Sequence, residues 1–195
     1  MNFIFDLGRV LINFEPVEYL QELFHDDGLV KRINELVFLS REWVDMDLGI
    51  LSYPEAREIF RRREPELRDE VYLAMDKMSD IFTPKPETIA LLQIVKDAGH
   101  RLYYLSNIHV ETRDFVLRKY SFFGLFDGGV FSCDVHINKP SPGIYLELLS
   151  KYGLSPHDCV FFDDMEENVA GAEKVGIRGM LYTGTDSVMS VLNNA

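Results

Sequence analysis

The stretch Phe3-Ile4-Phe5-Asp6-Leu7-Gly8-Arg9-Val10-Leu11 decides the fold of this chain. Three large apolar residues lead directly into an acid, and a short apolar run rich in Phe and Ile is typical of a buried strand. In open α/β sheets, ligands bind in the crevice outside the carboxyl ends of the strands, so Asp6 is predicted to stand at the mouth of a site. Taken alone, an acid after a strand more often begins a turn or caps a helix. The functional interpretation of Asp6 therefore depends on the partners that the rest of the chain supplies.

Composition and charge narrow the class of protein. With 195 residues, 47% of them hydrophobic, the chain is long enough for one domain, with or without a smaller inserted one. Its net charge of −12 is opposite to the basic footprint of nucleic-acid-binding proteins. No apolar run approaches the roughly 20 residues of a membrane span, and the N-terminus has no signal-peptide pattern. Cys133 and Cys159 are predicted to be buried free thiols in a reducing compartment, so we expect a cytoplasmic protein with neither nucleic-acid nor membrane partners.

Apart from the first strand, the alternation of apolar runs and helical patterns begins after residue 83. Strands are predicted at 2–6, 102–105, 130–132, 159–162 and 179–182. Helices are predicted at about 86–98, 110–119, 142–152, 166–175 and 185–193. Strands that alternate with helices of about ten residues indicate a parallel sheet with helices on both faces, which is an α/β fold.

Residues 16–78 show a different pattern, because apolar side chains recur at helical spacing throughout. Ser52 is predicted to cap a helix over about 54–63, with Glu55 three residues after the serine. A further helix is predicted over about 66–78, and no strand pattern occurs between these helices. The segment is therefore predicted to be an all-helical insertion.

Polar residues follow three of the predicted strands, and a lysine lies between the third and fourth. These residues are Asp6, Ser106, Asn107, Lys139, Asp163 and Asp164. Because parallel strands place their carboxyl ends at one edge of the sheet, these groups are expected to converge. Mg²⁺ would relieve the repulsion between the acids, the lysine would hold a phosphate, and one carboxylate would remain as a nucleophile. Each residue alone has an ordinary alternative as a helix cap, a solvated charge or an acidic helix start.

Four segments of the chain resemble motifs one to four of the haloacid dehalogenase superfamily. They are Asp6 after its apolar strand, Ser106-Asn107 after Leu105, Lys139-Pro140, and Asp163-Asp164 after Phe161-Phe162. The resemblance covers nearly the whole chain and implies a Rossmann-like sheet of order 5-4-1-2-3 with an all-helical cap inserted after motif one. The implied domains are a catalytic core over 1–14 and 83–195, and a cap over 15–82. The subgroup that this chain is most similar to contains bacterial α-D-glucose-1-phosphate phosphatases, and the N-terminal phosphatase domain of soluble epoxide hydrolases is similar too.

The resemblance also implies a role for each motif residue. Asp6 would be the nucleophile and, with the backbone carbonyl of Gly8 and the carboxylate of Asp164, a ligand of Mg²⁺. The phosphoryl group would be held by Ser106, Asn107 and Lys139, with Lys139 also counted as catalytic. Asp163 and Asn168 would support the site.

Gly8 departs from the family pattern, in which phosphatases usually carry a second Asp as the general acid and base. A positioned acid or base contributes about 10²–10⁴-fold to a rate, so its absence should matter. Three interpretations remain open. The leaving group needs little protonation, water or a cap residue substitutes, or the protein is slow or no enzyme at all.

The first hypothesis is a Mg²⁺-dependent phosphatase acting on a small phosphorylated molecule, such as the sugar phosphate glucose 1-phosphate. The alternatives are a metal-free 2-haloacid dehalogenase and a non-catalytic module that binds a phosphate ligand. Candidate substrate contacts, in the cap and beside motifs one and two, are Arg9, Phe14, Arg41, Trp43, Asp47 and His109. A buried cap core is the ordinary alternative for Trp43, and a solvated surface charge is that for Arg41. The oligomeric state stays open.

Overall fold

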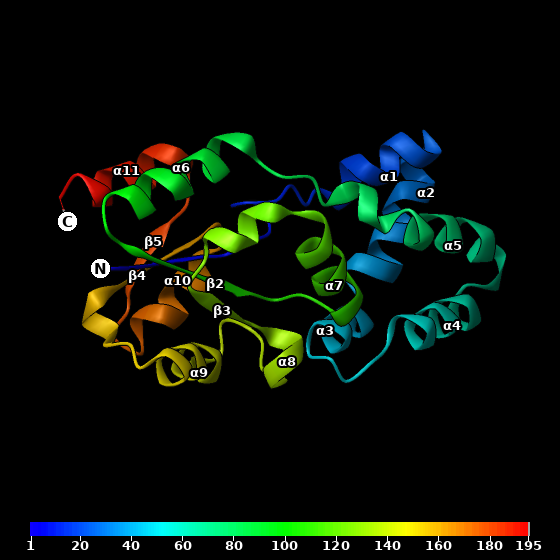
Figure 1. Cartoon of the computed structure of the whole chain (residues 1–195). Helices are drawn as coiled ribbons and strands as arrows, with labels where there is room; N and C mark the ends of the chain where they lie inside the picture. The colour runs from blue at the N-terminus through cyan, green and yellow to red at the C-terminus, as the bar shows by residue number, and fades with distance from the viewer. Residues whose placement is uncertain (195) are drawn as a thin grey trace.

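A five-stranded parallel sheet forms the centre of the computed structural model, which describes residues 1–194. The strands are β1 (Asn2–Phe5), β2 (Arg101–Ser106), β3 (Gly128–Phe131), β4 (Cys159–Asp163) and β5 (Arg178–Leu181). They lie in the order β3-β2-β1-β4-β5 (Figure 1), which is 5-4-1-2-3 from the other edge, so the predicted order is confirmed. β1 is central, with Phe5 paired to Tyr104 on one side and to Phe162 on the other.

Helices cover both faces of this sheet. They are α6 (Pro86–Asp97), α7 (Val110–Lys119), α9 (Pro142–Tyr152), α10 (Glu166–Glu173) and α11 (Thr185–Leu192). Side chains alternate across a strand, so Phe3 and Phe5 join the apolar cluster that includes residues of α6, α7 and α11, while Ile4 joins the one formed with α9 and α10. Figure 1 shows α6 and α11 on one side of the sheet and α9 and α10 on the other. Burial on both faces explains why β1 is a continuous apolar run.

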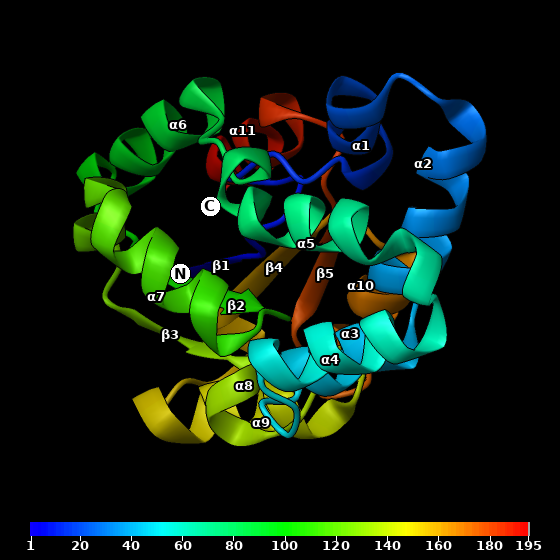
Figure 2. The same cartoon turned by 90° about the vertical axis from the view of Figure 1, so that its right-hand side faces the viewer.

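The segment between β1 and α6 is helical, as predicted. It contains α1 (Pro16–Phe24), α2 (Asp27–Ile33), a π-helical turn (Asn34–Phe38), α3 (Arg41–Asp47), α4 (Tyr53–Arg63), α5 (Arg68–Asp76) and the 3₁₀ turns Pro65–Leu67 and Met78–Ile81. The backbone N–H of Ser52 donates to the Glu55 carboxylate over 3.0 Å at the start of α4, as the predicted capping box requires. Figure 1 places this segment beyond the carboxyl ends of the strands, and Figure 2 looks onto it from that side. The domain boundaries, 1–14 with 83–195 and 15–82, stay a prediction.

The carboxyl end of α3 is attached to the segment that follows β3. This segment begins with α8 (Ser132–Val135), a short helix that takes up Ser132, which the sequence pattern had placed in the third strand. The Ser132 hydroxyl donates to the carbonyl of Asp47 over 2.6 Å, and the His136 ring nitrogen Nδ1 donates to the carbonyl of Leu48 over 2.7 Å. Together these bonds hold the last turn of α3 in place against the sheet domain.

The two segments also approach each other closely at Gly49. Its φ of +66° lies in the left-handed region, and a Cβ built there would lie only 2.5 Å from the carbonyl oxygen of Cys133. Glycine is therefore required at this point on both conformational and steric grounds. Cys133 and Cys159 are both buried free thiols, as predicted. No helix within residues 1–194 combines the length and apolar character needed to cross a bilayer.

Candidate active site

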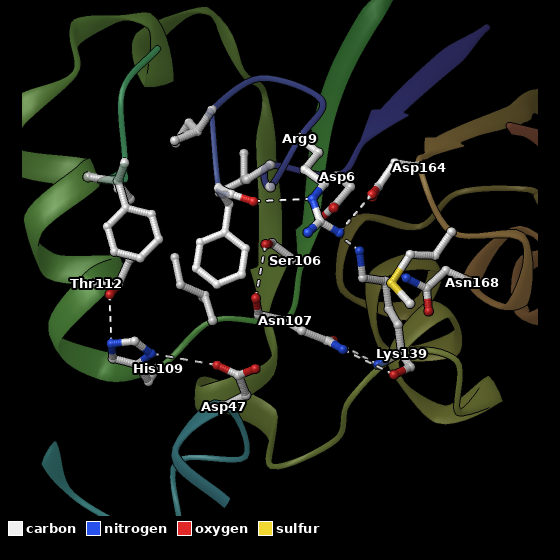
Figure 3. Close-up of a pocket in the computed structure, with 18 of the residues that line it drawn as sticks. Asp6, Arg9, Asp47, Ser106, Asn107, His109, Thr112, Lys139, Asp164 and Asn168 are labelled. Carbon is white, nitrogen blue, oxygen red and sulfur yellow. Dashed lines mark hydrogen bonds and ion pairs between the residues drawn. The ribbon is translucent and has the colours of Figure 1, made fainter. Parts of the chain in front are cut away.

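A cavity of about 230 Å³ lies between the carboxyl edge of the sheet and the helical segment. Its walls come from the loop after β1, from α3, from the loop after β2 and α7, and from the loops around Lys139 and after β4 (Figure 3). Most of the buried polar side chains of the described chain gather around it. The convergence predicted from the ends of the strands is therefore present in the structure.

Asp6 follows β1 and is held by its backbone, whose N–H donates to the carbonyl of Phe162 over 2.9 Å. The Nζ atom of Lys139 lies 2.7 Å from the carboxylate of Asp6 and 2.6 Å from that of Asp163. Burial raises the pKa of Asp6 to about 7, because Lys139 offsets only part of the desolvation and the Asp163 carboxylate adds repulsion. Burial by itself lowers the pKa of Lys139, but its two carboxylate neighbours outweigh this and raise it.

Asp163 is fully buried, and its carboxylate is occupied by this chain's own donors. Besides Lys139, the backbone N–H of Met165 donates to it over 2.9 Å and the amide of Asn168 over 3.0 Å. Asn168 and Asp163 therefore fix the ammonium group of Lys139 beside Asp6, while their supporting roles in a reaction stay a prediction. Asp164 differs, because it lines the cavity and its nearest cationic partner is Arg9, at 3.6 Å. Burial and the neighbouring Asp163 raise the pKa of Asp164.

The acids at this edge form a candidate metal centre. Ligand atoms of Asp6, Asp163 and Asp164 all lie within 4.8 Å of one another. Lys139 and the half-exposed Arg9 supply two positive charges against three carboxylates. Closely spaced carboxylate oxygens are the donors that hard divalent cations such as Mg²⁺ prefer. The donor set therefore fits such an ion. Gly8 lines the same cavity, and a Cβ at this position would have its closest contact at 3.9 Å, with Asp6.

Asn107 was predicted to bind phosphate, but its side-chain amide is already hydrogen-bonded to the protein. Its amide nitrogen donates to the carbonyl of Lys139 over 3.0 Å, and its amide oxygen accepts from the Lys139 N–H over 2.8 Å. Both ends of the amide thus hold the backbone of Lys139. Ser106 lines the cavity, and among the described residues its hydroxyl makes a single, long contact of 3.4 Å, to the carbonyl of Asn107. A bound anion would meet the Ser106 hydroxyl and the backbone of Asn107 rather than its amide.

A second polar group lines the cavity at Asp47 and His109. His109 is almost fully buried, and its Nε2 atom pairs with the Thr112 hydroxyl at 2.7 Å. Its Nδ1 atom lies 3.7 Å from the Asp47 carboxylate. Burial raises the pKa of Asp47, and His109 and Lys139 counteract part of that rise. Thr112 was not among the predicted site residues, although its position three residues after His109 puts both on one helical face.

Of the remaining residues predicted to contact substrate, some line the cavity and one does not. Trp43 lines the cavity and stacks against Phe14 with a centroid distance of 5.9 Å, and Arg9 also lines it. Arg41 does not, because its side chain is 77% exposed and pairs with Asp45 at 2.8 Å. The predicted contact of Arg41 with substrate is therefore corrected. Residues four apart share a helix face, so Arg41 and Asp45 point outward while Trp43 and Asp47 face the cavity.

Comparisons with known proteins agree with this architecture. Residues 2–176 match the family model of the haloacid dehalogenase-like hydrolases. A sesquiterpene phosphatase from Aspergillus oryzae is 25% identical over 180 residues, covering 92% of this chain and 88% of the relative. A phosphatase of phosphorylated carbohydrates from Thermotoga maritima is 26% identical over 182 residues, covering 89% and 81%.

Solved structures share the fold. A haloacid dehalogenase family enzyme from Bacteroides thetaiotaomicron, in a magnesium complex, superposes with a TM-score of 0.74 at 23% identity, over 94% of this chain and 92% of that one. The same enzyme has also been solved with magnesium and inorganic phosphate, with a TM-score of 0.73, 23% identity and coverages of 93% and 92%. An L-2-haloacid dehalogenase from Xanthobacter autotrophicus has a TM-score of 0.67 at 17% identity, over 100% of this chain and 82% of that one.

Proposed function

Because the chain belongs to the haloacid dehalogenase-like hydrolases, we propose that it is a Mg²⁺-dependent phosphatase of small phosphate monoesters. The observation that carries the proposal is the convergence of Asp6, Asp163 and Asp164 beside the buried ammonium group of Lys139. This arrangement joins a nucleophile, a cation site and a fixed positive charge for a phosphate. The two phosphatase relatives and the magnesium and phosphate complex of the Bacteroides enzyme support it.

In the proposed reaction, the Asp6 carboxylate attacks phosphorus and forms an aspartyl-phosphate. Lys139 orients the phosphoryl oxygens and offsets their charge. Ser106 and the backbone of Asn107, at the carboxyl end of β2, hold the same oxygens. Asp163 and Asn168 keep Lys139 in place. Asp6, Asp164 and the carbonyl of Gly8 would hold Mg²⁺, which supplies positive charge toward the phosphoryl oxygens.

The organic part of the substrate stays a prediction. The family resemblance predicts a sugar phosphate such as glucose 1-phosphate, and the Thermotoga relative supports this prediction. The Aspergillus relative is named for sesquiterpenes, and the cavity walls contain Phe14, Trp43 and Phe82, which would suit an apolar group. Both classes of phosphate ester therefore belong in the first test.

That test measures phosphate release from a panel of monoesters, which includes glucose 1-phosphate, isoprenoid monophosphates and aryl phosphates, with Mg²⁺ or with EDTA. We expect turnover with Mg²⁺ and a return to the uncatalysed rate with EDTA. Chloride release from 2-chloropropionate without metal would favour a dehalogenase instead. Binding of a phosphate analogue such as vanadate without turnover of any ester would favour a binding module.

Metal binding is expected to depend on pH through Asp6. Its pKa is about 7 in the metal-free folded protein against the ordinary 3.8, so the folded state binds more protons across this interval. Stability from this group is therefore lost as pH rises toward 7, and a metal that needs the carboxylate competes with the proton. We expect the rise in Tm produced by Mg²⁺ to grow from about pH 5 to about pH 8. An equal rise in Tm at every pH, measured by scanning fluorimetry, would contradict this assignment of Asp6.

A further inference from the structure

The Asp47 carboxylate lines the cavity, mostly covered by protein, and no hydrogen-bond donor reaches it within the described residues. Its side chain is 14% exposed, and the nearest side-chain nitrogen is Nδ1 of His109, at 3.7 Å, beyond hydrogen-bond distance. Within residues 1–194, no side-chain or backbone donor bonds to this carboxylate. A buried carboxyl group in this state retains its proton more readily than an exposed one and can donate it to a ligand oxygen.

Asp47 is also held rigidly, although it belongs to the helical segment. The Ser132 hydroxyl that donates to the carbonyl of Asp47 accepts from the N–H of Ile108 over 2.9 Å. Ile108 directly follows Asn107, so the same loop positions the backbone of the anion site and the carbonyl of Asp47. Figure 3 shows Asp47 and His109 on the opposite side of the cavity from Asp6 and Asp164. A monoester whose phosphoryl group lies on Asp6 would therefore extend its leaving group toward Asp47.

We propose that Asp47 performs the proton transfer for which Gly8 has no side chain; this inference rests on the proposed phosphatase function. As Asp6 attacks phosphorus, the bond from phosphorus to the ester oxygen breaks and that oxygen takes the proton of the Asp47 carboxyl group. The products are the free alcohol, phospho-Asp6 and an ionised Asp47. Asp47 then removes a proton from the attacking water as the bond between Asp6 and phosphorus breaks, which releases phosphate and restores the carboxylic acid.

His109 is assigned as a positioning residue. Its ring is held by Thr112 at Nε2 and lies between the rings of Trp43 and Tyr53, at centroid distances of 5.1 and 5.9 Å. The Nδ1 atom therefore faces Asp47 from a fixed direction and limits the rotation of the carboxyl group. This role does not require His109 to contact the reacting atoms.

The leaving group offers a test that separates chemistry from structure. An alkyl phosphate releases a strongly basic alkoxide that needs a proton, whereas 4-nitrophenyl phosphate releases a stable phenolate that does not. For Asp47→Asn we expect kcat/KM to fall about 10²–10⁴-fold for an alkyl phosphate and less than about 10-fold for 4-nitrophenyl phosphate. An equal loss for both esters, or no loss for the alkyl ester, would overturn the assignment.

Two further variants complete the experiment. Asp45→Asn makes the same change on the outward face of α3, where Asp45 pairs with Arg41, and should leave both rates unchanged. Gly8→Asp in the Asp47→Asn background should restore turnover of the alkyl ester, because a Cβ at position 8 meets nothing closer than 3.9 Å. Failure of this rescue while the Mg²⁺-induced rise in Tm is retained would count against the inference. If the unaltered chain hydrolyses neither ester, the proposed function falls, and this inference falls with it.

Discussion

Asp6→Asn is expected to lower kcat by about 10⁴-fold or more on every phosphate ester that the chain hydrolyses. An amide oxygen is a poor nucleophile, and an amide cannot carry the negative charge that a cation at this edge requires. Because Asn has nearly the volume of Asp, the packing around β1 should persist. Intact-protein mass spectrometry after acid quenching should detect a phosphorylated unaltered chain during turnover and none for the variant.

Asp97→Asn is a suitable control for this experiment, because Asp97 is exposed at the end of α6, away from the carboxyl edge of the sheet. It should retain full activity and the same Tm. If Asp6→Asn retained turnover in Mg²⁺, or if the phosphorylated residue mapped elsewhere, Asp6 would not be the nucleophile.

Lys139→Met is expected to have the largest effect on stability. The side chain of Lys139 is only 2% exposed and bridges two carboxylates, so its removal leaves buried charges without a partner. Loss of one partner from a buried ion pair costs about 3–5 kcal/mol, which urea denaturation of the metal-free protein should measure as a lower free energy of unfolding. Turnover should also be lost, because no fixed cation would orient the phosphoryl group.

Added Mg²⁺ should restore part of the stability of this variant but not its activity, since the ion offsets the carboxylates without replacing the ammonium group. Lys31→Met is the matched control. Lys31 is 77% exposed and lies 4.0 Å from its nearest carboxylate, so the free energy of unfolding should change by less than about 0.5 kcal/mol. A loss below about 1 kcal/mol for Lys139→Met, with phosphate affinity retained, would show that the buried pair is not needed.

Much of the fold could be predicted from the sequence because the decisive signals are local. Apolar runs that end in polar residues identify strands, and the parallel arrangement brings those ends to one edge without any knowledge of loop conformation. Asp6 and Asp164 are located in this way, whereas Lys139 lies in the loop before α9 and does not follow a strand directly. The all-helical character of the segment after β1 was equally clear from its apolar spacing.

The contacts that depend on two distant loops could not be predicted in this way. The amide of Asn107 is occupied by the backbone of Lys139, and the hydroxyl of Ser132 joins Ile108 to Asp47. No spacing in the chain indicates either pairing. The first joins the loop after β2 to the loop before α9, and the second depends on the packing of α3 against α8. The face on which Arg41 lies likewise depends on which side of α3 is covered by the sheet domain.

The attachment of Asp47 through Ser132 and of Leu48 through His136 has a practical consequence for protein engineering. A chimaera that exchanges only the helical segment for that of another relative would separate Asp47 from its support. The helical segment of the relative would need to be transplanted together with that relative's counterpart of residues 132–138. These two pieces are separate in the sequence, but substrate specificity and proton transfer would depend on both.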